Sequence, residues 1–207
     1  MLPGTVHPEN GRPRPGRFPV VAIVSSAGGL AATGLVLAGL PAGLPAAVIV
    51  LQHISPTYPS LLPEILRRHT ALPVAQALDG EPLEPGRVVV APPGHHLLVT
   101  ADRRLALIES GPTPPPRPSA DLLLTSLALA CGPDAIAVVL SGHGTDGATG
   151  ATAVHRFGGT VVASDAASSD YFSMPQAVIS RDDIVDHVLA VSDMAALLSA
   201  LVRAPAL

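Results

Sequence analysis

The chain has 207 residues, of which 48% are hydrophobic and 14% charged, and its formal net charge is -4. This composition excludes intrinsic disorder, and the length suits one well-buried domain. All 12 basic residues are Arg and they are scattered, which argues against a nucleic-acid or anionic-membrane partner. The single cysteine, Cys131, cannot form an internal disulfide, which favours a reducing compartment, so we expect a cytoplasmic protein.

Residues 1–17 are rich in Pro, Gly and Arg and lack apolar periodicity, so we expect a flexible tail there and a single domain over residues 18–207. The stretch from Phe18 to Pro63 contains no charged residue and is long enough for a membrane span. Glycines and prolines break it into pieces too short to cross the bilayer as one helix. We therefore expect buried strands and a buried helix here, and no membrane insertion.

Short β-branched runs alternate with Ala/Leu-rich segments along the first third of the domain. The runs at 19–24, 46–52 and 72–77 indicate strands, and the segments at 30–40 and 60–69 indicate helices. This alternation predicts an α/β fold of the doubly wound type, with a mainly parallel sheet and helices on both faces.

The middle of the chain departs from this alternation. Three strand-like runs follow one another at 86–93, 95–100 and 103–109, and Ala101-Asp102 is a plausible tight connection between the last two. We therefore expect an antiparallel hairpin insertion. After a proline-rich loop, Ser119 is a potential N-cap for a helix over 120–130.

The α/β pattern then resumes towards the C-terminus. The expected elements are a strand at 135–141, a helix from about Asp146, a strand at 159–165, a helix at 174–180, a strand at 185–190 and a final helix at 193–203.

Chemically active side chains follow three of the predicted strands. Ser26 follows the first strand, His53 the second, and Asp146 the strand that ends near residue 140. Ligands bind beyond the carboxyl ends of parallel strands, so we expect these side chains at one sheet edge. A hydroxyl, an imidazole and a carboxylate form an acyl-transfer site. Taken singly, each residue is better explained without catalysis, Ser26 and Asp146 as helix caps and His53 as a loop histidine, so the hypothesis depends on the three together.

The glycines after Ser26 suggest an oxyanion-binding turn. Gly28 and Gly29 allow a close turn from strand to helix, and the N–H of Ala27 is the natural first donor to an oxyanion.

We also considered a catalytic metal and a nucleotide. His53, His143 and Asp146 could ligate a metal, and His95-His96 adds an imidazole pair, but no established ligand spacing occurs. The chain has no Lys for a P-loop and no G-x-G-x-x-G after its first strand. We expect no metal and no cofactor.

The motifs together resemble one known family. The S-A-G-G loop at 26–29, the Q-H pair at 52–53, and the later runs RPSADLLLTSLA, VVLSGHGTDGATG and SMPQAVI occur in the order typical of the CheB-type methylesterase domain. The resemblance implies that Ser26 is the nucleophile, His53 the general base and Asp146 the carboxylate that orients it. It also implies hydrolysis of glutamyl γ-methyl esters on chemoreceptors, with deamidation of receptor glutamines as a related activity.

The resemblance also implies partners for this chain. The implied partners are a methylated chemoreceptor, as substrate, and a methyltransferase or histidine kinase of the same pathway.

The sequence also differs from the family pattern. Val24-Ser25 stands where the family usually has Gly-Ala, and His143 where well-known members carry Met. Residues 1–17 leave no room for the phosphorylatable receiver domain that often precedes the catalytic domain, so we expect the catalytic domain alone.

Three further residues are candidates for the rim of the site. His143 lies in the loop before Asp146, Met174 matches a family motif, and Arg117 lies on the proline-rich loop. A rival hypothesis from another class is a catalytically silent signalling module that docks a receptor or kinase, with Val24 and His143 as marks of a drifted site.

Overall fold

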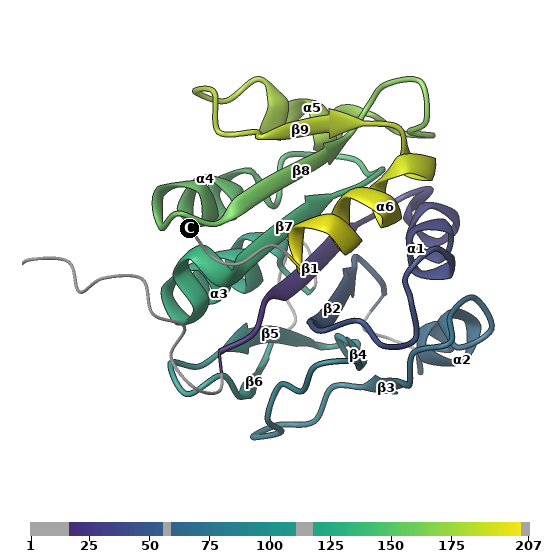
Figure 1. Ribbon diagram of the computed structural model, residues 1–207, viewed down its shortest axis with the longest axis vertical. Helices are drawn as coiled ribbons and strands as arrows, with labels where there is room; N and C mark the ends of the chain where they lie inside the picture. Colours follow the sequence, from purple (N-terminus) through teal and green to yellow (C-terminus); the bar gives the residue numbers. More distant parts are fainter. Residues whose placement is uncertain (1–16, 56–58, 111–117, 204–207) are drawn as a thin grey trace, which may run out of the picture.

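The computed structural model describes residues 17–55, 59–110 and 118–203. Its centre is a seven-stranded sheet in the order β3-β4-β2-β1-β7-β8-β9, in which every neighbouring pair is parallel (Figure 1). The strands are β1 (Val20–Ser25), β2 (Ala47–Gln52), β3 (Val74–Gln76), β4 (Val88–Val90), β7 (Ala135–Val139), β8 (Thr160–Ser164) and β9 (His187–Leu189). The predicted doubly wound α/β fold is confirmed.

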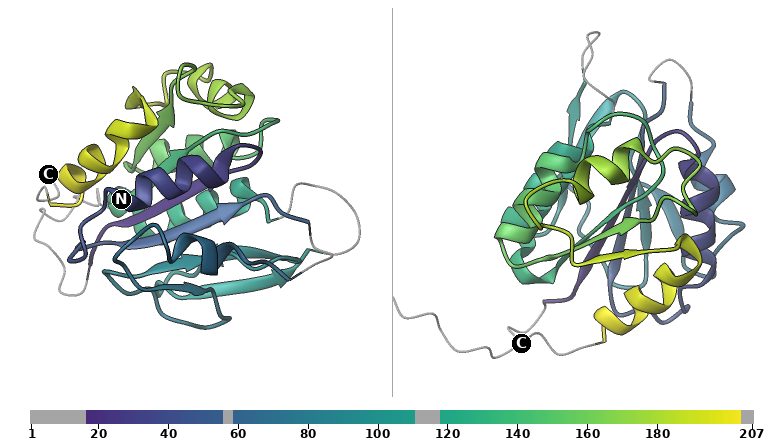
Figure 2. Two further views of the ribbon diagram at one scale, coloured as in Figure 1. Left: turned by 90° about the vertical axis from the view of Figure 1, so that its right-hand side faces the viewer. Right: turned by 90° about the horizontal axis from the view of Figure 1, so that it is seen from above.

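Helices cover both faces of this sheet. One face carries α1 (Gly29–Ala38), α2 (Leu62–Leu66) and α6 (Val191–Leu201), and the other carries α3 (Ala120–Cys131), α4 (Ala148–Arg156) and α5 (Ser173–Ile179). A short 3-10 helix, η1 (Gly132–Asp134), leads into β7. The right-hand view of Figure 2 shows α3 and α4 on one side of the sheet, with α1 and α6 on the other.

The two faces explain why the central strands are apolar at every position. In β1, Val20, Ala22 and Val24 pack into the core beneath α3, α4 and α5, whereas Val21 and Ile23 pack into the core beneath α1, α2 and α6. Successive side chains of a strand point to opposite faces, so a strand covered on both faces needs a continuous apolar run.

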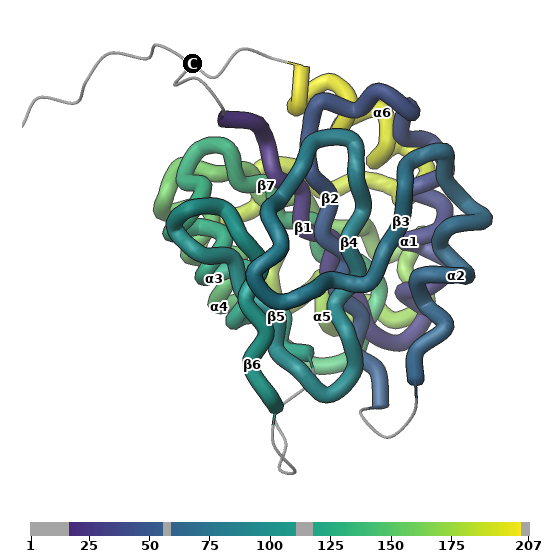
Figure 3. Tube along the Cα trace, turned by 90° about the horizontal axis from the view of Figure 1, so that it is seen from below, coloured from purple at the N-terminus to yellow at the C-terminus, as the bar shows by residue number. Residues whose placement is uncertain are grey.

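The predicted antiparallel hairpin is present as β5 (His95–Val99) and β6 (Leu105–Glu109). It packs on the same side of the sheet as α3, and Figure 3 shows it on the opposite side of the molecule from α2. The connection between the two strands is longer than the predicted Ala101-Asp102, since the strands are paired only as far as Val99 and Leu105. The Thr100 N–H closes the connection by donating to the Arg104 carbonyl at 2.9 Å, and Arg103 adopts a φ of 59°. The preceding run at 86–93 forms β4 of the main sheet.

The centre of the sheet is a topological switch point. The chain leaves β1 through α1 on one face, and it leaves β7 through α4 on the other. Loops diverge at such a point and leave a crevice at the carboxyl ends of the strands. Ser25 is paired with Gln52 in register, so Ser26 and His53 leave the sheet side by side.

Within the described ranges, no helix is both long and apolar enough to cross a membrane. The expected tail lies outside those ranges except for Arg17, and so does Arg117.

Candidate active site

The turn after β1 holds Ser26 against the end of β7. The Ser26 N–H donates to the Ser141 carbonyl at 2.9 Å, and the Ser26 carbonyl accepts from the Gly29 N–H at 3.0 Å. Gly28 has a φ of 72°, and a Cβ there would lie 2.7 Å from the Ser141 Oγ and from the Asp170 Cβ. Only glycine fits both this backbone conformation and this space.

Two N–H groups at this turn have no acceptor within the described residues. They belong to Ala27 and Gly28, whereas the Ala27 carbonyl is already bonded to the Ser141 hydroxyl at 2.8 Å. N–H groups at the start of a helix are suited to binding negative charge, and α1 begins at Gly29.

Ser25 and Ser26 differ sharply in their surroundings. Ser25 is fully buried, and its Oγ has no hydrogen-bond partner among the described residues. The first turn of α1 covers it so closely that a Cβ on Gly29 would lie 2.4 Å from the Ser25 Oγ. Ser26 is only half-buried. Of the two hydroxyls, Ser26 is therefore the accessible one.

His53 and Asp146 are hydrogen-bonded at the same edge of the sheet. The His53 Nε2 lies 2.9 Å from the Asp146 Oδ2, and the two side chains are only 13% and 7% exposed. An ionised carboxylate can only accept, so Nε2 carries the proton of this bond. The other ring nitrogen, Nδ1, is then the basic one in the neutral imidazole.

The Asp146 carboxylate is held by the start of α3 as well as by His53. Its Oδ1 accepts from the Ser119 hydroxyl at 3.1 Å and from the Asp121 N–H at 3.0 Å, and its Oδ2 accepts from the Ala120 N–H at 2.7 Å. Burial alone would raise the pKa of Asp146, but the hydrogen bonds from His53 and these N–H groups outweigh it and hold the pKa below its usual range. Asp146 is therefore ionised at neutral pH.

The local structure around Asp146 differs from the predicted one, in which a helix begins at about this residue. The helix that follows, α4, begins at Ala148 instead of near residue 146, and its N-cap is Gly147. Asp146 acts as a capping group for α3, because its carboxylate accepts hydrogen bonds from the first N–H groups of that helix. The expected N-cap at Ser119 is present, with its Oγ accepting from the Leu122 N–H.

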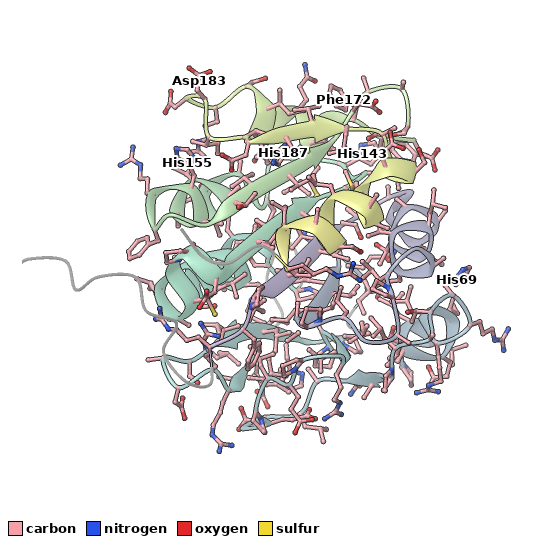
Figure 4. All side chains as sticks on the ribbon, in the orientation of Figure 1. His69, His143, His155, Phe172, Asp183 and His187 are labelled. Atoms are coloured by element: carbon pink, nitrogen blue, oxygen red, sulfur yellow. The ribbon has the colours of Figure 1, made fainter. Side chains whose placement is uncertain are left out.

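The three rim candidates have different positions. His143 is exposed, and its ring centroid lies 4.3 Å from that of Tyr171. Figure 4 shows His143 on the right and His155 on the left of the upper part of the molecule. Met174 differs from the expectation because its side chain is fully buried, with its sulfur beneath Gly142. The remaining candidate, Arg117, lies outside the described residues.

Four residues near the site were not assigned to it from the sequence. Asp121 and Ser119 contact Asp146, while Ser141 and Tyr171 are joined through the Tyr171 N–H, which donates to the Ser141 Oγ at 2.9 Å. The signal for Ser119 was its capping position. The other three carry no pattern that relates them to residues distant in sequence.

The adjacent histidines of β5 lie on opposite sides of their strand. His96 is buried, and its Nδ1 accepts from the Ser119 N–H at 3.0 Å, whereas the Nδ1 of His95 lies 3.1 Å from the Pro93 carbonyl. In the part of the chain that the structure describes, no three His, Cys, Asp or Glu side chains are grouped so as to hold a metal ion.

Comparison with known families decides the relationship of this chain. The model of the CheB methylesterase family matches residues 21–198. The chain belongs to the CheB methylesterase family. The match includes the strands and loops that carry Ser26, His53 and Asp146.

Curated relatives and a solved structure agree with this membership. A protein-glutamate methylesterase/protein-glutamine glutaminase 4 of Myxococcus xanthus is 40% identical over 190 residues, which cover 92% of this chain and 53% of the relative. The protein-glutamate methylesterase FrzG of Myxococcus xanthus is 41% identical over 166 residues, which cover 80% of this chain and 49% of the relative. The chain thus spans about half the length of the curated relatives it matches.

The crystal structure of the Thermotoga maritima CheB methylesterase catalytic domain aligns with a TM-score of 0.85 and 34% sequence identity. The alignment covers 90% of this chain and 100% of that domain. This chain therefore shares the CheB catalytic-domain fold.

Proposed function

We propose that this CheB-family domain hydrolyses glutamyl γ-methyl esters on a chemoreceptor-type protein, releasing methanol and a free glutamate. The observation that carries the proposal is the 2.9 Å bond between His53 and an ionised Asp146 at the edge where Ser26 leaves the sheet. The names of the relatives, protein-glutamate methylesterases, support the same substrate class.

The proposed mechanism uses each of these groups once in each half of the reaction. The Ser26 Oγ attacks the ester carbonyl while the Nδ1 of His53 takes its proton, and Asp146 stabilises the imidazolium that forms. The N–H groups of Ala27 and Gly28 bind the oxyanion of the tetrahedral intermediate. His53 then returns the proton to the departing methanol, and water hydrolyses the acyl-enzyme by the same route.

The same site also accounts for deamidation of a receptor glutamine. Attack by Ser26 on a carboxamide gives the same acyl-enzyme, with ammonia leaving in place of methanol. The Myxococcus xanthus relative is named for both activities, which supports this extension.

The proposal includes a cellular context. A substrate on the cytoplasmic helices of a chemoreceptor requires a cytoplasmic enzyme, and its methyl esters require a methyltransferase that makes them. A methyltransferase or a histidine kinase of the same pathway is therefore the proposed partner. We propose residues 18–207 as the folded catalytic domain.

Covalent labelling tests the proposal against the silent-module alternative. A fluorophosphonate probe should label the wild-type chain and the Ser25→Ala variant, and should fail to label Ser26→Ala. Methanol release from a methylated chemoreceptor should fall by ~10³-fold or more in Ser26→Ala, as for other serine nucleophiles. A folded wild-type chain that neither labels nor releases methanol would instead support a docking module.

A further inference from the structure

The Asp121 carboxylate binds the backbone at the start of α4, and the Asp146 carboxylate binds the backbone at the start of α3. Asp121 lies in the first turn of α3, and its Oδ1 accepts from the Gly147 N–H at 2.9 Å and from the Gly150 N–H at 2.8 Å. Asp146 lies just before α4 and accepts from the Ala120 and Asp121 N–H groups of α3. The two carboxylates therefore close a ring of hydrogen bonds between the helix starts.

Close packing of the two helices makes this exchange possible. A Cβ on Gly150 would lie 2.5 Å from the Leu124 Cβ and 3.0 Å from the Asp121 carbonyl, so α4 approaches α3 at a distance that only glycine allows. At this distance the Gly150 N–H reaches the Asp121 carboxylate. Each carboxylate also lies where the partial positive charge of a helix N-terminus favours it.

The bond to Gly147 matters most for Asp146. Gly147 follows Asp146 directly and has a φ of 99°, in a loop where Gly144 has a φ of 88°. Glycine moves between backbone conformations more freely than other residues, so this segment needs an external contact to keep one geometry. Asp121 supplies that contact through the Gly147 N–H, and its own N–H fixes the Asp146 Oδ1.

We propose that Asp121 is a positioning residue for the Asp146–His53 pair. The Asp121 carboxylate holds the Gly147 and Gly150 N–H groups, and this fixes the segment that carries Asp146 so that its carboxylate meets the His53 Nε2. Asp121 acts on the reaction only through that segment. Its catalytic consequence rests on the proposed esterase function, whereas the effect on the His53–Asp146 bond does not.

The test compares Asp121→Ala with Asp121→Asn. An Asn at this position keeps an oxygen that can accept both N–H groups, whereas Ala keeps neither bond. We expect Asp121→Ala to lower kcat by ~10–100-fold with little change in KM, by analogy with the loss of hydrogen-bond partners that orient metal ligands. Asp121→Asn should remain within about threefold of wild type, because the acceptor is retained. Asp193→Ala, which removes an exposed acidic residue from the first turn of α6, is the matched control and should not change kcat.

A second measurement does not depend on activity. The proton NMR signal of the hydrogen-bonded His53 ring N–H, assigned by its absence in His53→Ala, should be lost or broadened in Asp121→Ala and retained in Asp121→Asn. If Asp121→Ala does not fold, Asp121→Ser replaces it, since its shorter side chain cannot reach both N–H groups. A folded Ala or Ser variant with an unchanged ring signal and full kcat would overturn the proposal, and so would an equal loss in Asp121→Asn. Failure of the wild-type chain to hydrolyse esters, with the NMR result as expected, would overturn the esterase function and leave the positioning role intact.

Discussion

Gly142, which follows β7, lies against Ser26, which follows the neighbouring strand β1. A Cβ on Gly142 would lie 2.8 Å from the Ser26 Cβ and 2.7 Å from the Met174 sulfur, and atoms cannot approach so closely without displacement. The backbone of Gly142 is also bonded to its neighbours, since its N–H donates to the Tyr171 carbonyl at 2.9 Å. A side chain at position 142 would therefore have to push either Ser26 or Met174 aside.

We expect Gly142→Ala to lower kcat by ~10-fold or more, because a displacement of about 1 Å at a reacting group can cost a hundredfold in rate. Gly43→Ala is the control, since nothing lies within 4 Å of the Cβ it would add. Steady-state kinetics and thermal unfolding of both variants check the prediction. Full activity in Gly142→Ala would mean that Met174 alone moves and that Ser26 keeps its position.

Asp146→Asn should destabilise the fold at neutral pH. Both carboxylate oxygens of Asp146 accept hydrogen bonds, and an amide NH₂ in place of one oxygen would face a donor. A lost hydrogen bond to a buried charged group costs about 1–3 kcal/mol in the free energy of unfolding, so we expect a loss of that size. Turnover should also fall steeply, because an amide favours the wrong tautomer of His53.

The stability difference between wild type and Asp146→Asn should depend on pH. The pKa of Asp146 is lowered in the folded state, so its ionised form stabilises the fold above the unfolded value of about 3.9, and this contribution is lost as pH falls through the lower folded pKa. Urea unfolding at several pH values should therefore show the difference narrowing below about pH 4. Asp193→Asn, at an exposed site in α6, controls for loss of a helix-end charge. A difference that stays constant down to pH 2 would show that the charge of Asp146 contributes nothing.

Activity should rise with pH if His53 is the base. Only the neutral imidazole can take the Ser26 proton, so protonation of His53 removes the base. We expect kcat/KM to increase from acidic pH and to level off once the base is neutral. The measurement uses wild type and Ser25→Ala, which should share one profile. A profile that is flat from about pH 5 to 9 would rule out a histidine base.

The sequence predicted which side chains lie at the carboxyl edge of the sheet, but not the contacts that these side chains make there. Ser26, His53 and Asp146 could be related because each follows a strand, and strands of one parallel sheet end at one edge. Ser119 was predicted as the cap of α3 because capping is local. That the capped end of α3 also meets Asp146 depends on how α3 packs on α4, which periodicity does not describe.

The burial of Met174 is a second feature that the sequence did not predict. A Met-Pro pair at a helix start is compatible with a rim position or with a core position, and the pattern of α5 alone does not distinguish them. The structure buries Met174 because the loop after β7 passes over it, with Gly142 above its sulfur. Tertiary packing of one loop therefore decides the position, and no local signal in the sequence reports it.

The exposed pair of His143 and Tyr171 is the basis of the last prediction. His143 follows Gly142 directly, and its ring contacts the Tyr171 ring with centroids 4.3 Å apart and planes tilted by 59°. His53 is already bonded to Asp146 through Nε2, so in the proposed mechanism the site has a base without His143. We therefore expect His143 to line the mouth of the site without acting as the base.

His143→Met should retain esterase activity, because methionine can pack against Tyr171 in place of the imidazole ring. Steady-state kinetics of wild type and His143→Met test this, with Tyr171→Phe as a control that keeps the ring contact. Complete loss of turnover in a folded His143→Met variant, with His53→Ala still active, would instead make His143 the base and reassign the triad.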